Sequence, residues 1–326
     1  LYTGNNANNR AITGVGFAPD LVWVKSRPAN SNHNISDSVR GNNKILFPNS
    51  TAGETTPNTI SSLNSDGFTV GDGNGYDVNK NGESIVSWNW KAGGSSSSNS
   101  DGSITSTVSA NVDAGFSIVG YTGNNVAGAT IGHGLSAKPD LIIVKIRADN
   151  YTGRVYNSIS GATKYLDWAS TATLGTYQHM WNNTEPTSSV FSVGHDVTVG
   201  GYPIRDFIAY VFHSVEGYSK VGSYTGNGNA NGTFVYTGFK PAYVLIKGST
   251  VAENWNLYDS ARTPVNDALD ERLKPNSTAA EVTSDMIDFT SNGFKIRTTD
   301  GEINTSGATY IYLAFAETPF KHSNAR

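Results

Sequence analysis

Residues 16–25, with the sequence Gly-Phe-Ala-Pro-Asp-Leu-Val-Trp-Val-Lys, decide the fold because this stretch occurs twice more along the chain. The later copies are residues 137–145 and 238–247, and each is a proline followed by an apolar run that ends in lysine. β-branched and aromatic runs are typical of strands, and a proline just before a strand removes no ladder hydrogen bond. We therefore predict one buried strand in each copy.

Four further anchors accompany this stretch in the same order in all three copies, which chance would not preserve. They are residues 2–5, 121–124 and 224–227; 35–38, 156–158 and 258–260; 66–70, 190–193 and 292–296; and 85–90, 207–212 and 310–315. The anchors are short, rich in β-branched and aromatic residues, and bounded by Gly, Asn, Asp and Pro. Many short strands with regular turn signals predict an all-β fold, here three tandem antiparallel β-sandwich domains of jelly-roll or lectin-like type.

The anchors divide the chain into repeat 1 (residues 1–94), repeat 2 (114–217) and repeat 3 (218–326). Residues 95–113 are rich in Gly and Ser and are predicted to be a flexible linker. Repeats 2 and 3 have a further strand before their first anchor, at 116–120 and 218–222, and we expect the corresponding strand of repeat 1 to precede residue 1. The one predicted helix covers residues 265–273, between Pro264 and Pro275.

Composition excludes several classes of protein. The 326 residues carry a net charge of −4 without a basic block, so we expect no nucleic-acid partner. No apolar run approaches the length of a membrane span, so we expect no membrane segment. Cysteine is absent, which excludes disulfides and cysteine nucleophiles.

The sequence contains only weak matches to motifs for metal binding or catalysis. Asp77, Asn79 and Asn81 match the start of a calcium loop, but Trp88 stands where the bidentate Glu should be, which favours a polar turn. The aligned residues Asp37, Asn157 and Asp259 exchange acid for amide, which suits turn capping better than acid–base catalysis. We therefore predict that the chain is not an enzyme and uses no cofactor or metal.

Aromatic residues in polar, loop-like context are candidates for stacking on a sugar ligand. The predicted ligand-binding residues are Trp168, Tyr177, Trp181, Tyr202 and Trp255. The alternative is that these aromatic side chains pack beneath long loops.

Residues 16–27, 114–124, 181–191 and 310–320 resemble a repeat found in virion proteins of marine tailed bacteriophages. The resemblance covers essentially the whole chain, although Ser-Trp-Asn-Trp at 87–90 replaces the Ala-Trp-Cys-Trp usual in that family. It implies a tail-fibre-like structural protein at the virion surface, and it brings no established catalytic residues.

From this resemblance we expect a distal tail-fibre or spike segment that mediates adsorption to a host-surface glycan or protein. The expected partners are other virion proteins and further copies of the chain, as a trimer by analogy with fibres. One alternative is a capsid decoration or other virion-surface protein without a ligand. A polysaccharide depolymerase is a further alternative, and it requires two carboxylates across a cleft.

Overall fold

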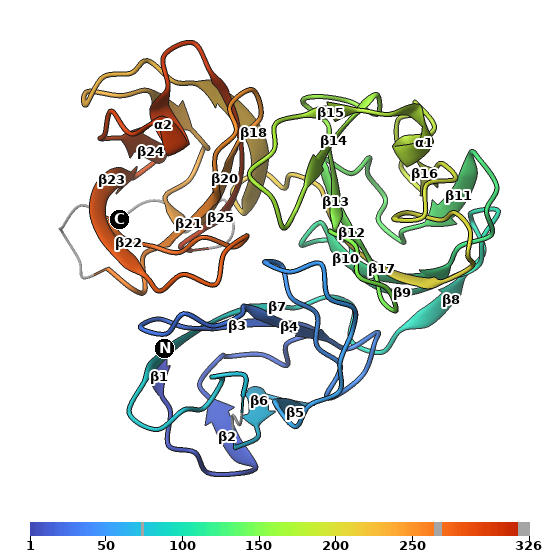
Figure 1. Ribbon diagram of the computed structural model, residues 1–326, viewed down its shortest axis with the longest axis horizontal. Helices are drawn as coiled ribbons and strands as arrows, with labels where there is room; N and C mark the ends of the chain where they lie inside the picture. Colours follow the sequence, from blue (N-terminus) through green and yellow to red (C-terminus); the bar gives the residue numbers. More distant parts are fainter. Residues whose placement is uncertain (73–74, 264–268, 319–326) are drawn as a thin grey trace.

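The computed structural model describes residues 1–72, 75–263 and 269–318 (Figure 1). The described residues form an all-β protein with several antiparallel sheets, as predicted. The described part contains two short helices, α1 (Gln178–Trp181) and α2 (Gly301–Asn304).

One four-stranded arrangement recurs in each repeat. In repeat 1 its order is β1 (Tyr2–Thr3), β7 (Ser84–Trp90), β3 (Leu21–Ser26) and β4 (Asn34–Asp37). In repeat 2 it is β10 (Phe116–Thr122), β17 (Asp206–Phe212), β12 (Leu141–Ile146) and β13 (Arg154–Asn157). In repeat 3 it is β18 (Ser219–Thr225), β25 (Thr309–Ala316), β20 (Pro241–Gly248) and β21 (Trp255–Asp259). The strands predicted from the sequence anchors are therefore confirmed.

The register between the two middle strands is also the same in each repeat. Leu21 pairs with Trp90, and Leu141 pairs with Phe212. Tyr243 pairs with Phe315 in the third copy. These pairings allow each position of one repeat to be matched to a position in the others.

A second sheet lies against each of these arrangements. The second sheets are β2 (Arg10–Thr13), β6 (Gly67–Val70) and β5 (Ile60–Asn64); β11 (Ala129–Gly132) and β16 (Val190–Val193); and β19 (Phe234–Tyr236), β24 (Gly293–Ile296), β23 (Val282–Thr290) and β22 (Leu269–Arg272). Apolar side chains of the two sheets meet in a core, as Val22 and Phe68 do in repeat 1. The predicted helix at 265–273 is wrong where it overlaps β22, and residues 265–268 lie outside the described ones.

The predicted linker at 95–113 is also wrong, because about half of it forms strands of a sheet. It contains β8 (Ser97–Asn99) and β9 (Ser106–Asn111), and β9 pairs with β10 from Ser106↔Tyr121 to Asn111↔Phe116. With β14 (Lys164–Asp167) and β15 (Gly175–Thr176), these strands extend the sheet of repeat 2 to eight strands. The composition suggested flexibility, but Ile104 and Val108 are buried and hold this segment in place.

The three repeats surround a shared apolar core, so they are not independent units. Figure 1 shows them arranged around one centre. Side chains from all three form a single buried cluster, which includes Trp23, Trp88, Ile143, Trp168 and Leu313. We call this cluster the central core. Because each repeat also has its own core, the described residues form three peripheral cores and the central one.

Candidate functional site

The most elaborate side-chain arrangement lies where the repeats meet, and it begins with aromatic contacts in the central core. The ring of Trp23 contacts those of Trp88 and Trp168 at centroid distances of 5.6 and 6.0 Å. Trp90 contacts Tyr243 at 5.7 Å and Phe315 at 5.9 Å. Edge-to-face pairs of this kind add about 0.5–1.5 kcal/mol each beyond the burial of their surface.

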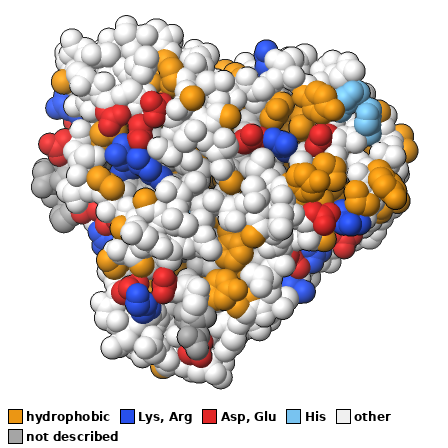
Figure 2. Space-filling model, in the orientation of Figure 1, with side chains coloured by type: hydrophobic (Ala, Val, Ile, Leu, Met, Phe, Trp, Pro, Cys, Tyr) orange, Lys and Arg blue, Asp and Glu red, His pale blue; other side chains and the backbone are white. Residues whose placement is uncertain are grey.

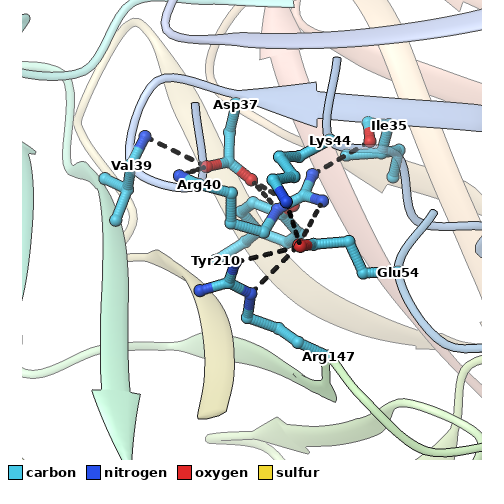
Figure 3. A network of polar contacts seen from close by, with 8 residues as sticks. All are labelled: Ile35, Asp37, Val39, Arg40, Lys44, Glu54, Arg147 and Tyr210. Carbon is cyan, nitrogen blue, oxygen red and sulfur yellow. Dashed lines mark hydrogen bonds and ion pairs between the residues drawn. The ribbon is translucent and has the colours of Figure 1, made fainter. Parts of the chain in front are cut away.

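A network of hydrogen bonds and ion pairs connects repeats 1 and 2 at their junction (Figure 3). Asp37 Oδ1 accepts hydrogen bonds from the backbone N–H groups of Val39 and Arg40, which confirms its predicted turn-capping role. Its Oδ2 accepts from Arg40 Nε at 2.5 Å and from the Tyr210 hydroxyl of repeat 2 at 2.8 Å. Arg40 and Asp37 have no exposed side-chain surface, so their charges are compensated inside the protein.

Glu54 extends this network across the junction. Arg147 of repeat 2 donates from Nε and Nη2 to the two Glu54 oxygens, at 3.0 Å each. Arg40 also donates to Glu54, at 3.3 Å. Burial alone would raise the pKa of the Glu54 carboxyl, but these hydrogen bonds and charges lower it below its ordinary value, so the group stays ionised.

The junction between repeats 3 and 1 contains the same network at equivalent positions. Arg262 donates to Asp259 at 2.6 Å and to Glu281 at 2.8 Å. Arg27 of repeat 1 donates to Glu281 at 2.8 Å, as Arg147 does to Glu54. The indole of Trp88 takes the place of the Tyr210 hydroxyl and donates to Asp259 at 3.0 Å.

The junction between repeats 2 and 3 lacks all four charged groups. Asn157, Ser160, Leu174 and Ser249 occupy the four positions. One backbone hydrogen bond is common to all three junctions: the N–H of Leu174 donates to the carbonyl of Ser249 at 2.9 Å, as the N–H groups of Glu54 and Glu281 do to the carbonyls of Arg147 and Arg27. The three junctions therefore share one geometry, but only two of them are ionic.

A buried lysine is the next-to-last residue of β3, β12 and β20, the anchor strands of the three repeats. Lys145 and Lys247 donate across a junction to the carbonyls of Thr51 and Thr171, at 2.9 and 3.0 Å. Lys25 donates to the carbonyl of Ala29 within its own repeat. Burial lowers the pKa of each of the three lysines to about 8.

One further repeat motif was missed in the sequence. Residues 49–54 (Asn-Ser-Thr-Ala-Gly-Glu) and 276–281 (Asn-Ser-Thr-Ala-Ala-Glu) match and carry the acid of each ionic junction. Asn49 and Asn276 look like glycosylation acceptors, but their Oδ1 atoms accept hydrogen bonds from the N–H groups of His33 and Trp255. Comparison with 169–174, Ala-Ser-Thr-Ala-Thr-Leu, could have revealed the motif.

The prediction that five aromatic residues stack on a sugar ligand is wrong for three of them, because their side chains are buried. Trp168 and Trp255 lie in the central core, and Trp181 lies in the core of repeat 2. Each has 1–2% of its surface exposed. The alternative of aromatic side chains packed beneath loops therefore applies to these three.

Tyr177 and Tyr202 do lie on the surface, with 42% and 76% of their area exposed. The Tyr177 ring contacts His179, whose ring lies 3.9 Å from that of His195. The backbone N–H of Gly201, next to Tyr202, donates to the carbonyl of Asp196. These contacts connect both tyrosines to one end of repeat 2, which we call the Tyr177–Tyr202 surface. Figure 2 shows histidine side chains at the upper right of the molecule, with hydrophobic side chains beside them.

The calcium-loop candidate is not a metal site in this conformation. The Asn79 Oδ1 accepts from the N–H of Asn5 and from Arg10, and its Nδ2 donates to the carbonyls of Ala7 and Gly71. Asn79 is thus fully engaged in holding the first anchor. No cluster of three His, Cys, Asp or Glu side chains able to hold a metal occurs in the described ranges.

Two neighbouring cavities, of about 500 and 450 Å³, lie along β7. Both are lined by Asn89, Trp90 and Tyr218. Asp259 also lines the larger one, but its carboxylate is occupied by Trp88 and Arg262. We call the two cavities together the β7 groove.

Residues 1–319 match a family described as a domain of unknown function, DUF7483. No curated protein and no solved structure matches the chain. Within the residues that the structure describes, no helix is long and apolar enough to cross a membrane.

Proposed function

The chain belongs to the DUF7483 family, and we propose that it is a phage virion structural protein, a distal tail-fibre or spike segment that binds a host-surface glycan. In this proposal it consists of three tandem antiparallel β-sandwich repeats on the virion surface. It acts by binding and without catalysis, together with other virion proteins. The resemblance of the repeats to phage virion proteins supports this assignment.

The Tyr177–Tyr202 surface is the observation that carries the adsorption function. Exposed tyrosine rings offer flat apolar faces with a polar hydroxyl, and such rings supply contact area at low entropic cost. Tyr202 and the neighbouring Ile204 are 76% and 56% exposed. Tyrosine is among the residue types enriched at the hot spots of binding surfaces.

Binding of the purified protein to host cells or to their extracted surface polysaccharide tests this function. We expect Tyr202→Ala and Tyr177→Ala each to weaken binding at least tenfold. Tyr236→Ala in repeat 3 is the matched control, because Tyr236 is 60% exposed but lies away from this surface. Equal binding by all three variants would contradict the proposal.

A capsid decoration protein without a ligand is the second candidate. It is favoured by the burial of Trp168, Trp181 and Trp255, which removes three of the five predicted stacking groups. Electron microscopy of intact particles labelled with antibody to this chain distinguishes an adsorption protein from a decoration protein. Adsorption predicts label at the tail periphery, and decoration predicts label spread over the head.

A further inference from the structure

A cavity of about 330 Å³ lies where repeats 1 and 2 meet, beside the ion pair of Glu54 and Arg147 that Figure 3 shows. We call it the junction cavity. Its lining includes these two residues, Thr122 and the consecutive residues 204–206. Small-molecule sites in proteins occupy about 300–1,000 Å³, so the junction cavity is large enough for one unit of a ligand.

The other two junctions show that the fold does not require the side chains at 204–206. A backbone hydrogen bond from the first anchor fixes the alignment of this segment in the three repeats: Gly4 N–H to Glu83, Gly123 N–H to Arg205 and Gly226 N–H to Ala308. Ile204-Arg205-Asp206 therefore corresponds to Gly82-Glu83-Ser84 in repeat 1 and to Gly307-Ala308-Thr309 in repeat 3. Since those junctions close without an isoleucine, an arginine and an aspartate at the respective positions, the three side chains of repeat 2 have a role other than closing the junction.

The polar groups of the junction cavity suit a ligand that both donates and accepts hydrogen bonds. Asp206 Oδ1 accepts from the Thr122 hydroxyl at 2.7 Å, and its Oδ2 accepts from no residue that the structure describes. Arg205 donates to Asp149 from Nε at 2.6 Å and to the Ile204 carbonyl from Nη1, which leaves Nη2 available. A sugar hydroxyl is both a donor and an acceptor, so adjacent hydroxyls can bind a carboxylate and a guanidinium together.

The charges of the junction cavity favour an uncharged ligand. Two lining residues are cations, Arg147 and Arg205, and two are anions, Glu54 and Asp206. An ion of either sign would therefore meet repulsion as well as attraction. Both Glu54 oxygens accept hydrogen bonds from Arg147, and the pKa of this carboxyl lies below its ordinary value. Glu54 is thus unsuited to be the proton donor of glycoside hydrolysis, and the cavity suits binding.

An exposed aromatic side chain lies close to these polar groups in the chain. Ile204 lines the cavity and is 56% exposed, and Tyr202, two positions earlier, is 76% exposed. The N–H of Tyr202 donates to Asn125 Oδ1 at 3.1 Å, which connects this loop to the one after β10. Lys80 and Thr305 occupy the position of Tyr202 in the other repeats. Repeat 2 alone therefore combines apolar and hydrogen-bonding groups here, as binding sites for small molecules do.

We propose that the junction cavity binds one neutral hexose unit of a glycan. Arg205 and Asp206 bind two adjacent hydroxyl groups of the sugar, and Ile204 and Tyr202 contact its apolar C–H face. This inference rests on the proposed adsorption function, for which it names the class of ligand and the residues that recognise it.

NMR titration of the ¹⁵N-labelled protein with the methyl glycosides of glucose, galactose and mannose tests the site. We expect at least one of these neutral sugars to shift the amide signals of residues 147–148 and 204–206. Glucuronic acid and glucosamine, which are charged, should bind about tenfold more weakly. No shift at these residues with any neutral sugar, or tighter binding of a charged sugar, would overturn the proposal.

A double variant, Arg205→Ala with Asp206→Thr, introduces the residues that repeat 3 has at the equivalent positions, so we expect the fold to be retained. Binding of the neutral sugar should weaken about tenfold or more, because two charged hydrogen-bonding groups are lost. The matched control is Lys240→Ala with Glu317→Thr, which also removes one charge of each sign, from an ion pair of repeat 3 whose side chains are 45% and 42% exposed. Equal binding by the double variant and the wild-type protein would overturn the proposal.

The extracted host polysaccharide distinguishes a failure of this inference from a failure of the adsorption function. If the wild-type protein and the double variant bind the polysaccharide equally, adsorption is supported and the hexose site is wrong. If the wild-type protein binds a neutral hexose at residues 204–206 but does not bind the polysaccharide, the site is supported and the adsorption function is wrong.

Discussion

Trp88 of repeat 1 donates its indole Nε1–H to Asp259 of repeat 3 at 3.0 Å, although 171 positions separate the two residues. The same carboxylate binds Arg262, and the Arg262 guanidinium lies 5.6 Å from the centre of the Trp88 ring. One tryptophan thus joins the hydrogen-bonding, ionic and aromatic parts of a junction. This arrangement makes each ionic junction sensitive to the loss of a single arginine.

We predict that Arg262→Met lowers the free energy of unfolding by about 3–5 kcal/mol. The substitution keeps much of the side-chain volume but leaves Asp259 buried without its cation, while Glu281 keeps only Arg27. Denaturant unfolding measures the effect. Ser160→Ala, at the equivalent position of the non-ionic junction, should change stability by less than about 0.5 kcal/mol. A similar loss in both variants would contradict the assigned role of Arg262.

The third junction allows the converse experiment. Leu174 packs against the central core. Leu174→Glu should therefore destabilise the protein by about 1–3 kcal/mol, because it adds a partly buried carboxylate without a cation. Adding Ser160→Arg, Ser249→Arg and Asn157→Asp should recover part of the loss, since the four residues then match the ionic junctions. If the fourfold variant is less stable than Leu174→Glu alone, the junctions are not equivalent.

The strands could be predicted well from the sequence because the anchors recur three times. A pattern that keeps its order over three copies does not arise by chance. The prediction failed for the linker at 95–113, where Gly and Ser suggested flexibility but β9 pairs with β10. β8 forms the edge of that sheet, and an edge strand needs few apolar residues, so composition alone does not reveal it.

The burial of Trp168 and Trp255 could not be predicted from local sequence. Both residues have polar neighbours in sequence, and they are covered only because the repeats close around the central core. The ionic junctions are harder still to predict, because Arg40, Glu54 and Arg147 meet only in three dimensions. An alignment of the three repeats would have shown that the acids and arginines of a junction are either all present or all replaced by uncharged residues.

The central core predicts how the protein unfolds. All six tryptophans have at most 8% of their surface exposed, and five of them lie in the central core. We expect iodide to quench little of the native tryptophan fluorescence, and we expect a single thermal transition. Three separate transitions would show instead that the repeats are independent. Fragment 1–217 should show strong quenching, because removal of repeat 3 uncovers Trp88 and Trp90.

The asparagines of the missed motif should be structural. Asn276→Ala should cost about 1–3 kcal/mol, because the backbone N–H of buried Trp255 loses its acceptor. Asn49→Ala should have the same effect through His33. The exposed Asn42 provides the control, and Asn42→Ala should leave the unfolding midpoint unchanged. Unchanged stability in all three variants would show that the two asparagine hydrogen bonds do not stabilise the fold.

The buried lysines predict a rise in stability at alkaline pH. The pKa of Lys25, Lys145 and Lys247 is about 8 in the folded protein, against an ordinary value of 10.5. Between these values the unfolded chain holds more protons than the folded one, so the free energy of unfolding increases with pH from about 8 to about 10. Above about pH 10 the buried tyrosines oppose this trend. Burial raises the pKa of Tyr312 to about 12, so that the unfolded chain ionises first.

Urea unfolding at several pH values between 7 and 10.5 measures this dependence. Lys145→Met should flatten the slope between pH 8 and 10 by about a third, because it removes one of three equivalent groups. Lys91→Met is the control, since Lys91 is exposed and should leave the slope unchanged. A stability that falls steadily from pH 7 to pH 10 in the wild-type chain would mean that these lysines keep their protons in the folded state.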